Sequence, residues 1–272
     1  KYRIVYSKTE LCNKISEIKH PTVRNVLKYF DIKEGVEIHH FSDLPARSGI
    51  GSSSAFTVAL ITAISKHYKM NLKKKKIAKI AIFVEQKMNK EYVGNQDQII
   101  TTFGGFKKIT LKKNFFSVKN LNLNNLNKIR QNSLLLFSGK SRTADKIAKS
   151  KVKNIKNKKS TKALLEIKKT CNMAESIILS KKLNLKILGN LMNYSWNNKK
   201  KLSKSVSNKF INDYMDILNK NNILGAKVLG AGGGGFIFVL AEKKFHKKII
   251  KKTNLLSIDY NIDKLGAECG KI

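Results

Sequence analysis

Apolar and polar positions along the first half of the chain predict helices and strands in turn. His20-Pro21-Thr22 begins a helix that continues as VRNVLKYF, with proline near its start, where a missing backbone N–H costs little. Residues 36–41, VEIHHF, alternate like a strand with one buried face, and residues 53–68 are apolar nearly all round, which predicts an interior helix. This half therefore combines short strands with buried helices.

A second helix follows, with its apolar positions on one face and lysines on the other. The apolar face is formed by Ile77, Ile80, Ala81, Val84 and Met88. Two strand-like pieces, FKKITL and FFSVKNL, come after Gly104-Gly105, and we interpret the asparagine-rich residues 120–132 as a connection between domains.

The second half begins with the apolar strand SLLLF at 133–137 and the turn SGKSR, and lysine-rich helices extend from there to about Asn222. A strand, KVLG, leads into the loop AGGGG at 231–235, and FIFVL follows as another buried strand. Strands and helices mixed in this way predict an α+β fold. We divide it into two domains, residues 1–130 and residues 131–272.

A glycine- and serine-rich loop, PARSGIGSSSAF at 45–56, lies directly before the interior helix. A helix N-terminus presents unpaired N–H groups and the positive end of the helix dipole, and glycines let the backbone come close to a phosphate. The loop has neither a Walker A sequence nor the third glycine of a dinucleotide fingerprint. Phosphate binding is one interpretation, and a tight turn capped by serine is the other.

Two carboxylates after that helix are candidates for chemistry. Glu85 lies on the second helix, and Asp97 lies in the turn VGNQDQ that follows it. Carboxylates are ligands for Mg²⁺, and one of them is suited to accept a proton from an alcohol. The alternative is ordinary surface charge, and the nearby Glu91 is a rival for the same role.

Two further turns contain residues suited to ligands. In SGKSR at 138–142, a strand end meets donors for a sugar or a phosphate, although a plain surface turn has the same composition. Four consecutive glycines at 232–235 weaken packing between two apolar strands, which favours a function in which something approaches the backbone closely.

The adjacent His39 and His40 face opposite sides of a strand, so we assign them structural roles.

Composition narrows the partners of this chain. Its net charge is +37, nearly all of it from lysine, and the lysines are scattered over helix faces together with many asparagines. Nucleic-acid readers usually combine lysine with arginine and aromatic residues. We therefore interpret the excess as a compositional bias, whose positive field still attracts anionic substrates such as nucleotides and sugar phosphates.

Cysteine usage and hydropathy indicate a cytoplasmic protein. Cys12, Cys171 and Cys269 lie far apart with no CxxC pairing, which predicts neither a disulfide framework nor a zinc site and fits a reducing compartment. No apolar run is long enough to span a bilayer, and no signal peptide begins the chain. Lys1 is not methionine, and KYRIVYS is typical of the interior of a protein, so we expect a missing N-terminal segment.

Three signals occur together in order: P-x-x-x-G-I-G-S-S-S-A before a helix, a carboxylate pair after it, and K-V-L-G-A-G-G-G-G-F near the end. With these signals the chain resembles the GHMP kinases, named for galactose, homoserine, mevalonate and phosphomevalonate. The stretches VGNQDQIITTFGGF, LFSGKSRTADKI and SWNNKKKLSKSVS are most similar to those of bacterial D-glycero-D-manno-heptose 7-phosphate kinases. The loop R-x-P-x-R-x-x-x-x-G-G-G-T-D, with which the family normally begins, is not found in this sequence.

The resemblance implies a two-domain α+β fold, with an ATP-binding N-terminal half like domain 2 of ribosomal protein S5 and a ferredoxin-like C-terminal half. It implies ATP and Mg²⁺ as cofactors, and Asp97 as the group that takes the proton from the acceptor hydroxyl. The residues implied to bind ATP are Pro45, Gly49, Gly51, Ser52, Ser53, Ser54, Gly232, Gly233 and Gly234. Ser53 and Glu85 are implied for Mg²⁺, and the candidates for binding the sugar phosphate are Gly104, Gly105, Ser141, Arg142 and Lys199.

The leading hypothesis is an ATP-dependent kinase that phosphorylates the anomeric hydroxyl of D-glycero-D-manno-heptose 7-phosphate to the 1,7-bisphosphate, in nucleotide-activated heptose biosynthesis. A kinase for another sugar, of fucose or galactose type, is an alternative. A decayed kinase scaffold that binds nucleic acid is a third hypothesis, and the three intact motifs count against it. The expected partners are ATP and a sugar phosphate, with no membrane. The oligomeric state is open, a homodimer included.

Overall fold

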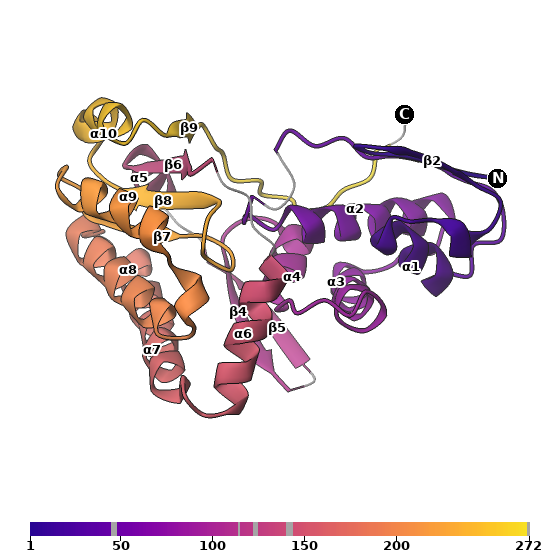
Figure 1. Cartoon of the computed structure of the whole chain (residues 1–272), viewed down its shortest axis with the longest axis horizontal. Coiled ribbons are helices and arrows are strands. Elements are labelled where there is room, and N and C mark those ends of the chain that lie inside the picture. The colour runs from indigo at the N-terminus through magenta and orange to yellow at the C-terminus, as the bar shows by residue number, and fades with distance from the viewer. Residues whose placement is uncertain (45–47, 114, 122–124, 140–143, 271–272) are drawn as a thin grey trace. The chain divides into compact units, whose positions relative to one another are not determined.

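The computed structural model describes residues 1–44, 48–113, 115–121, 125–139 and 144–270. The chain divides into two compact units, and Figure 1 labels most of their helices and strands. Unit 1 consists of Lys1–Ala46, Gly51–Lys119 and Asp263–Ile272, and unit 2 consists of Arg47–Ile50 and Asn120–Ile262. The C-terminal residues thus belong with the first unit, and the four residues before Gly51 belong with the second.

Unit 1 contains a three-stranded sheet in the order β2-β1-β3 and a two-stranded sheet of β4 and β5. β1 pairs antiparallel with β2 and parallel with β3. The strands are β1 (Tyr2–Val5), β2 (Thr9–Cys12), β3 (Glu37–His39), β4 (Lys107–Lys112) and β5 (Phe115–Asn120). The last three lie in stretches predicted as strands, whereas β1 and β2 were not predicted from the sequence.

The helices of unit 1 share a hydrophobic core with β1. Tyr2 and Ile4 are buried while Arg3 between them is exposed, as the alternation of a strand requires. The helices are α1 (Pro21–Tyr29), α2 (Ser52–His67), α3 (Lys74–Phe83) and α4 (Gln96–Phe103), with a 3₁₀ turn η1 (Ile15–Glu17) and a π-helix η2 (Val84–Met88). α2 lies where the interior helix was predicted, and Val58 and Ile61 on it are fully buried.

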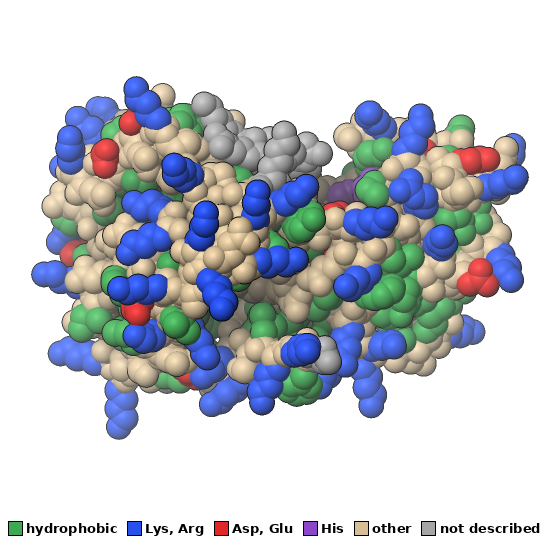
Figure 2. Space-filling view, turned by 60° about the horizontal axis from the view of Figure 1, so that its bottom comes forward, with side chains coloured by type: hydrophobic (Ala, Val, Ile, Leu, Met, Phe, Trp, Pro, Cys, Tyr) green, Lys and Arg blue, Asp and Glu red, His purple; other side chains and the backbone are tan. Residues whose placement is uncertain are grey.

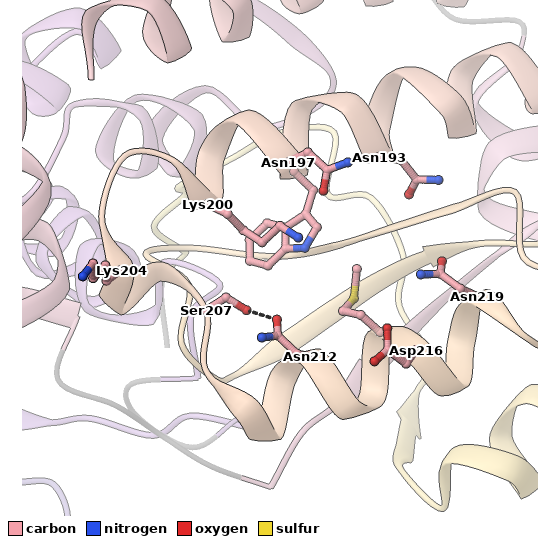
Figure 3. Close-up of a pocket in the computed structure, with 10 residues that line it drawn as sticks. Asn193, Asn197, Lys200, Lys204, Ser207, Asn212, Asp216 and Asn219 are labelled. Carbon is pink, nitrogen blue, oxygen red and sulfur yellow. Dashed lines mark hydrogen bonds between the residues drawn. The ribbon is translucent and has the colours of Figure 1, made fainter. Parts of the chain in front are cut away.

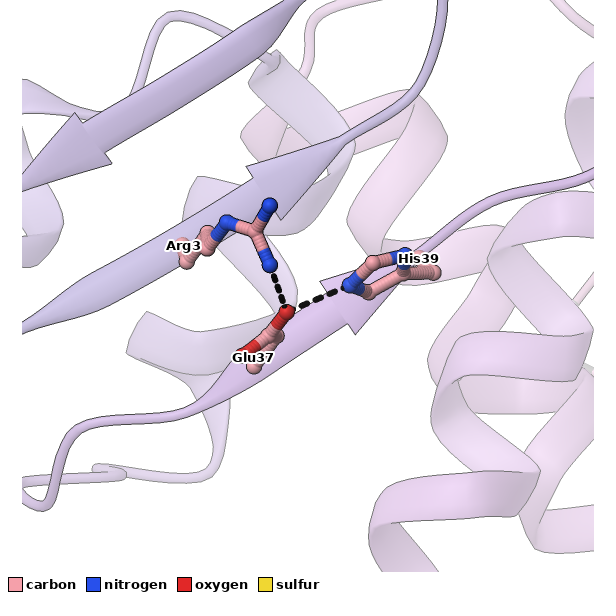
Figure 4. A network of polar contacts seen from close by, with 3 residues as sticks. All are labelled: Arg3, Glu37 and His39. Carbon is pink, nitrogen blue, oxygen red and sulfur yellow. Dashed lines mark hydrogen bonds and ion pairs between the residues drawn. The ribbon is translucent and has the colours of Figure 1, made fainter.

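A polar network joins β1 and β3 on the exposed side of their sheet (Figure 4). Arg3 and Glu37 are paired in the parallel register, and the Arg3 guanidinium contacts the Glu37 carboxylate. His39 places Nε2 2.5 Å from Oε1 of the same carboxylate, and the ring of His40 lies 4.1 Å from the ring of Phe56. Both histidines therefore make structural contacts within unit 1, as the sequence predicted.

Unit 2 is built on a four-stranded antiparallel sheet in the order β7-β8-β6-β9. The strands are β6 (Ser133–Phe137), β7 (Gly225–Val228), β8 (Phe236–Leu240) and β9 (Leu256–Ile258). β6 and β8 have the bounds that the sequence predicts, because Ser138 follows the apolar residues of β6 and Gly235 precedes those of β8. The predicted four-glycine loop connects β7 to β8.

The other elements of unit 2 are helices, some of which pack against this sheet. They are α5 (Leu126–Gln131), α6 (Ala144–Lys156), α7 (Thr161–Leu179), α8 (Leu185–Lys200), η3 (Lys204–Val206), α9 (Lys209–Asn219), η4 (Lys243–Phe245) and α10 (His246–Thr253). The core between helices and sheet includes Leu136, Trp196, Ile211, Leu218 and Ile237. Residues 120–132, interpreted as a connection between domains, contain α5, and the long segments 51–119 of unit 1 and 120–262 of unit 2 meet at Lys119 and Asn120.

Two glycines let α8 lie very close to the residues of β7. A Cβ at Gly189 would lie 2.8 Å from Cβ of Leu224 and would also overlap the Leu224 carbonyl. Gly225 at the start of β7 faces the backbone of Gly189 equally closely. The approach of helix and strand therefore requires glycine on both sides.

Side chains of α8 also hydrogen-bond to the backbone of β7 and the loop after it. Asn193 accepts through Oδ1 from the N–H of Ala226 at 2.9 Å. The Lys199 ammonium donates to the carbonyls of Val228 and Gly230 at 3.0 and 2.7 Å. These bonds fix the helix along the strand and at the beginning of the four-glycine loop.

Lysine and arginine side chains are spread over the face shown in Figure 2 and do not gather into one patch there. This distribution agrees with the interpretation of the net charge as a compositional bias. Within the part of the chain that the structure describes, no helix has both the length and the apolar character that crossing a membrane requires.

Candidate functional site

The serines of the predicted phosphate loop form the first turn of α2. Gly51 is the N-cap residue, with φ of 80° and ψ of 18°, a left-handed conformation that favours glycine. The first helical hydrogen bond joins the Ala55 N–H to the Gly51 carbonyl at 2.9 Å. No side-chain cap is present among the described residues, so the serine-capped turn is not what forms here. Ser52, Ser53 and Ser54 begin the helix in the way that an anion site at a helix N-terminus requires.

Asp97 lies against this helix start. It is in the first turn of α4, its side chain is exposed, and a Cβ built on Gly51 would lie 3.3 Å from its Cβ and Cγ and 3.5 Å from Oδ2. Glycine at position 51 therefore leaves the space that the Asp97 carboxylate occupies. The structure thus brings together two elements that the sequence separates by more than 40 residues: the predicted phosphate loop and the predicted base.

Glu85 is placed by an irregularity in its helix. α3 ends at Phe83 and continues as the π-helix η2, in which Asn89 N–H donates to the Val84 carbonyl at 2.8 Å, five residues back. A π turn widens the helix, so Val84 and Glu85 are both fully buried although they are neighbours. The alternative interpretation of Glu85 as surface charge is therefore wrong.

The Glu85 carboxylate is held through one of its two oxygens. Oε2 accepts from Ser54 Oγ at 3.0 Å and from Gln98 Nε2 at 2.5 Å, and Oε1 has no hydrogen-bond donor among the described residues. Burial raises the pKa of Glu85, and the hydrogen bonds from Gln98 and Ser54 oppose that increase. Oε1 of this buried carboxylate can therefore still accept a hydrogen bond or bind a cation.

This arrangement fits a hard divalent cation. Mg²⁺ takes oxygen ligands, and Oε1 of Glu85 is an oxygen without a donor next to the serines of α2. The serine that contacts Glu85 is Ser54, which is buried, whereas Ser53 is exposed. The predicted pair of Ser53 and Glu85 is therefore not in direct contact in the described structure, and its role in binding Mg²⁺ stays a prediction.

The four-glycine loop is shaped by contacts within unit 2. Gly232 and Gly233 have φ of 96° and 77°. A Cβ at Gly232 would lie 2.5 Å from the carbonyl oxygen of Val206 in η3, and the Gly233 N–H donates to that carbonyl at 2.7 Å. Asn208 Nδ2 donates to the Gly233 carbonyl at 3.0 Å. The backbone of η3 thus lies against Gly232 and Gly233, as closely as a ligand was expected to. Binding of ATP by Gly232, Gly233 and Gly234 stays a prediction.

The first part of the predicted phosphate loop packs on the same glycine loop in unit 2. The Phe236 N–H donates to the Ser48 carbonyl at 3.2 Å, and a Cβ at Gly230 would lie 2.5 Å from the Gly49 carbonyl oxygen. Residues 48–50 and the loop between β7 and β8 are far apart in the sequence. The structure therefore brings parts of the two predicted glycine loops together.

The predicted substrate residues have structural contacts of their own. Gly104 and Gly105 have φ of 64° and 66°, and the Gly105 N–H donates to the Asp263 carbonyl at 2.5 Å. A Cβ at Gly104 would lie 2.7 Å from the carbonyl carbon of Leu265, so the C-terminal residues occupy the space that these glycines leave. The Lys199 ammonium binds backbone carbonyls of unit 2, as described above. A role for the three residues in binding a sugar phosphate stays a prediction.

Three predicted site residues lie outside the described residues. They are Pro45, predicted for ATP, and Ser141 and Arg142, predicted for the sugar phosphate.

Sequence reasoning missed Gln98, which is fully buried and donates to Glu85. The signal that could have found it is its place on α4 beside buried Ile99, four residues before Thr102, which is also buried. A glutamine on an apolar helix face needs a polar partner, and a carboxylate nearby is a natural one.

Unit 2 also contains a cavity of about 650 Å³ between α8, η3 and α9 (Figure 3). Its walls are mainly amide and charged side chains, with Ser207 Oγ donating to Asn212 Oδ1 at 2.7 Å. Its two apolar residues, Trp196 and Met215, are largely buried in the core. None of the predicted site residues that the structure describes lines it.

Comparison with known proteins identifies the family. Residues 15–105 match the model of the GHMP kinases N terminal domain, and residues 173–253 match the model of the GHMP kinases C terminal domain. The chain is 29% identical over 242 residues to the D-glycero-alpha-D-manno-heptose 7-phosphate kinase of Campylobacter jejuni, covering 86% of this chain and 70% of that one. It is 30% identical over 234 residues to the mevalonate kinase of Methanocaldococcus jannaschii, covering 85% of this chain and 70% of that one.

A solved structure has the same fold. The crystal structure of a D-glycero-D-manno-heptose 1-phosphate kinase from Bacteriodes thetaiotaomicron superposes with a TM-score of 0.78 at 19% identity, over 100% of this chain and 83% of that one. The two-domain α+β fold expected from the sequence is therefore confirmed. The two domain matches, the 30% identical relative and this fold agree, and the chain belongs to the GHMP kinases.

Proposed function

We propose that this chain phosphorylates the anomeric hydroxyl of D-glycero-D-manno-heptose 7-phosphate with ATP and yields the 1,7-bisphosphate, with Mg²⁺ as cofactor. The observation that carries the proposal is the position of the Asp97 carboxylate against Gly51, at the start of α2. A phosphate at this helix N-terminus would lie beside a group that can accept a proton. Transfer of a phosphoryl group to an alcohol needs both.

In the proposed reaction, the anomeric oxygen attacks the γ-phosphorus of ATP. The new O–P bond forms while the bond from the γ-phosphorus to the bridging oxygen breaks, ADP leaves, and Asp97 accepts the proton of the hydroxyl. The N–H groups at the start of α2 stabilise the phosphate charge, and positioning of this kind supplies most of the catalysis in phosphoryl transfer. When Mg²⁺ is bound, it would neutralise phosphate charge, and Glu85 with a serine of α2 would hold it.

The choice of the heptose rests on the similarity to the Campylobacter jejuni enzyme and on the stretches VGNQDQ and SGKSR. The mevalonate kinase of comparable identity also transfers a phosphoryl group to an alcohol, but its acceptor is not a sugar. Another sugar, of fucose or galactose type, is the nearest alternative, because the direction of the hydroxyls is read by side chains of the substrate pocket.

Release of ADP by the purified chain tests the proposal. ATP and Mg²⁺ are supplied with D-glycero-D-manno-heptose 7-phosphate, galactose, fucose or mevalonate, and the Asp97→Asn variant is run beside the wild type. We expect turnover with the heptose phosphate and a loss of about 10²- to 10⁴-fold in the variant, the range that a general base contributes.

Each other outcome has a meaning. Turnover with galactose, fucose or mevalonate alone would replace the proposed substrate, and full activity of Asp97→Asn would remove Asp97 from its role. No turnover with any acceptor, together with nucleic-acid binding that weakens steeply with salt, would favour the decayed scaffold.

A further inference from the structure

Glu85 and Gln98 form a buried carboxylate–amide pair in unit 1. Both side chains are 0% exposed, and Gln98 lies one residue after Asp97 on α4. The hydrogen bond from Gln98 Nε2 to Glu85 Oε2 is 2.5 Å long, shorter than the 3.0 Å bond from Ser54 Oγ to the same oxygen. Two donors thus converge on one carboxylate oxygen.

The second oxygen of each group is left without a partner. Oε1 of Glu85 and Oε1 of Gln98 are buried, and neither has a hydrogen-bond donor among the described residues. An unpartnered buried acceptor destabilises the folded chain, so two of them on one pair are not what a purely structural contact would leave. Since no described residue supplies a donor to these two oxygens, a bound cation or another donor would complete them.

The amide of Gln98 also determines which oxygen of Glu85 is engaged. A carboxylate rotates about its last bond unless hydrogen bonds hold it, and the bonds from Ser54 and Gln98 both hold Oε2. Oε1 is consequently the oxygen that stays available. Residues that orient a metal ligand in this way typically change metal affinity by about 10- to 100-fold when they are replaced.

We propose that Gln98 is a positioning residue of the divalent-cation site, which fixes the Glu85 carboxylate so that Oε1 is the oxygen offered to the cation. The inference rests on the proposed function, since it needs Glu85 to bind the cation that accompanies the nucleotide. It assigns Gln98 no contact with ATP or with the sugar.

Binding of Mn²⁺ in the presence of ADP, followed by water proton relaxation, tests the role without turnover. Gln98→Met keeps the shape of the side chain and removes the donor, and Gln98→Glu keeps its polarity but places a second carboxylate beside Glu85. Gln86→Met is the matched control, because Gln86 lies next to Glu85 in η2 but donates to the Val93 carbonyl and Asn95 Oδ1.

We expect Gln98→Met to weaken Mn²⁺ binding by about 10- to 100-fold and Gln98→Glu to weaken it as well, because an ionised carboxylate cannot donate to Glu85. Gln86→Met should stay within about threefold of the wild type. In kinase assays, saturating metal should restore kcat of Gln98→Met to near the wild-type value, because a positioning residue of the metal site acts through metal affinity. General damage to the fold would lower kcat at every metal concentration.

Three results would overturn the inference: unchanged Mn²⁺ affinity in Gln98→Met, equal losses in Gln98→Met and Gln86→Met, or a kcat that excess metal does not restore. If Gln98→Met does not fold, Gln98→Glu decides, since unchanged affinity there has the same meaning. If the wild type itself neither binds Mn²⁺ with ADP nor releases ADP, the proposed function fails. Failure of the inference alone leaves the wild type active and metal-dependent.

Discussion

Replacing Gly51 with alanine tests whether Asp97 acts from the position that the structure gives it. The new Cβ would lie 3.3 Å from Cβ and Cγ of Asp97 and 3.5 Å from Oδ2. A contact of 3.3 Å is tighter than most Cβ atoms make, so the neighbour must give by a few tenths of an ångström. The neighbour here is the proposed base itself.

The size of the effect follows from that displacement. A misplacement of about 1 Å at a reacting centre costs about 10²-fold in rate, so a shift of roughly 0.3–0.5 Å lowers kcat about 4- to 10-fold. Alanine at φ of 80° adds a backbone cost of about 1–2 kcal/mol, which lowers stability independently of the chemistry.

Gly49→Ala separates the two effects. Gly49 has a similar φ of 87°, but among the described residues its Cβ would meet only the carbonyl oxygens of Leu229 and Gly234, at 3.8 and 4.0 Å. Both variants should therefore lose similar backbone stability, measured as Tm by circular dichroism. Only Gly51→Ala should lose kcat, measured as ADP release at saturating ATP and acceptor. Equal kcat values in the two variants would refute the reasoning.

Three further predictions concern stability. Lys199→Met should lower the free energy of unfolding by about 1–3 kcal/mol in chemical denaturation, because the carbonyls of Val228 and Gly230 lose a charged donor. Replacing its exposed neighbour, Lys200→Met, should change that free energy by less than about 0.5 kcal/mol. A raised KM for the sugar phosphate with unchanged stability would instead assign Lys199 to the substrate. Gly189→Ala, which in an ordinary helix stabilises by about 1 kcal/mol, should destabilise by about 1–3 kcal/mol because of the overlap with the residue before β7, and a higher Tm would contradict this packing. Burial and then the nearby charge of His40 lower the pKa of His20 from 6.5, so the unfolded chain takes up a proton first as the pH falls. Stability should therefore decrease below about pH 6.5, and less steeply in His20→Asn, as pH-dependent denaturation would measure.

Elements with one dominant local signal were predictable from the sequence. Four of the five residues of β6 are buried, and its apolar run ends at Phe137, where the strand ends. α2 follows a glycine-rich loop and is apolar nearly all round, so both its start and its burial were predicted. In these elements the local pattern and the tertiary packing agree.

The candidate site was predictable only in the parts for which the resemblance to the family supplied the residues. The closeness of Asp97 to the loop before α2 followed from the resemblance, and the structure supports it with the contact at Gly51. The burial of Glu85 was not predictable, because a period of 3.6 residues places it at the edge of the apolar face and a π turn moves it inward. Gln98 and the carbonyl contacts of Lys199 depend on residues distant in the sequence, which a pattern of single residues does not contain.

The contact between α8 and β7 also affects how copies of this protein behave toward one another. β7 is an edge strand of its sheet, and an edge strand normally offers free N–H and carbonyl groups with which a strand of another chain can pair. Asn193 and Lys199 occupy groups of this row, and the helix that carries them covers it. At the other end of the sheet, β9 has only three residues. The sheet is therefore protected at both edges against intermolecular strand pairing, by a helix on one side and by a very short strand on the other.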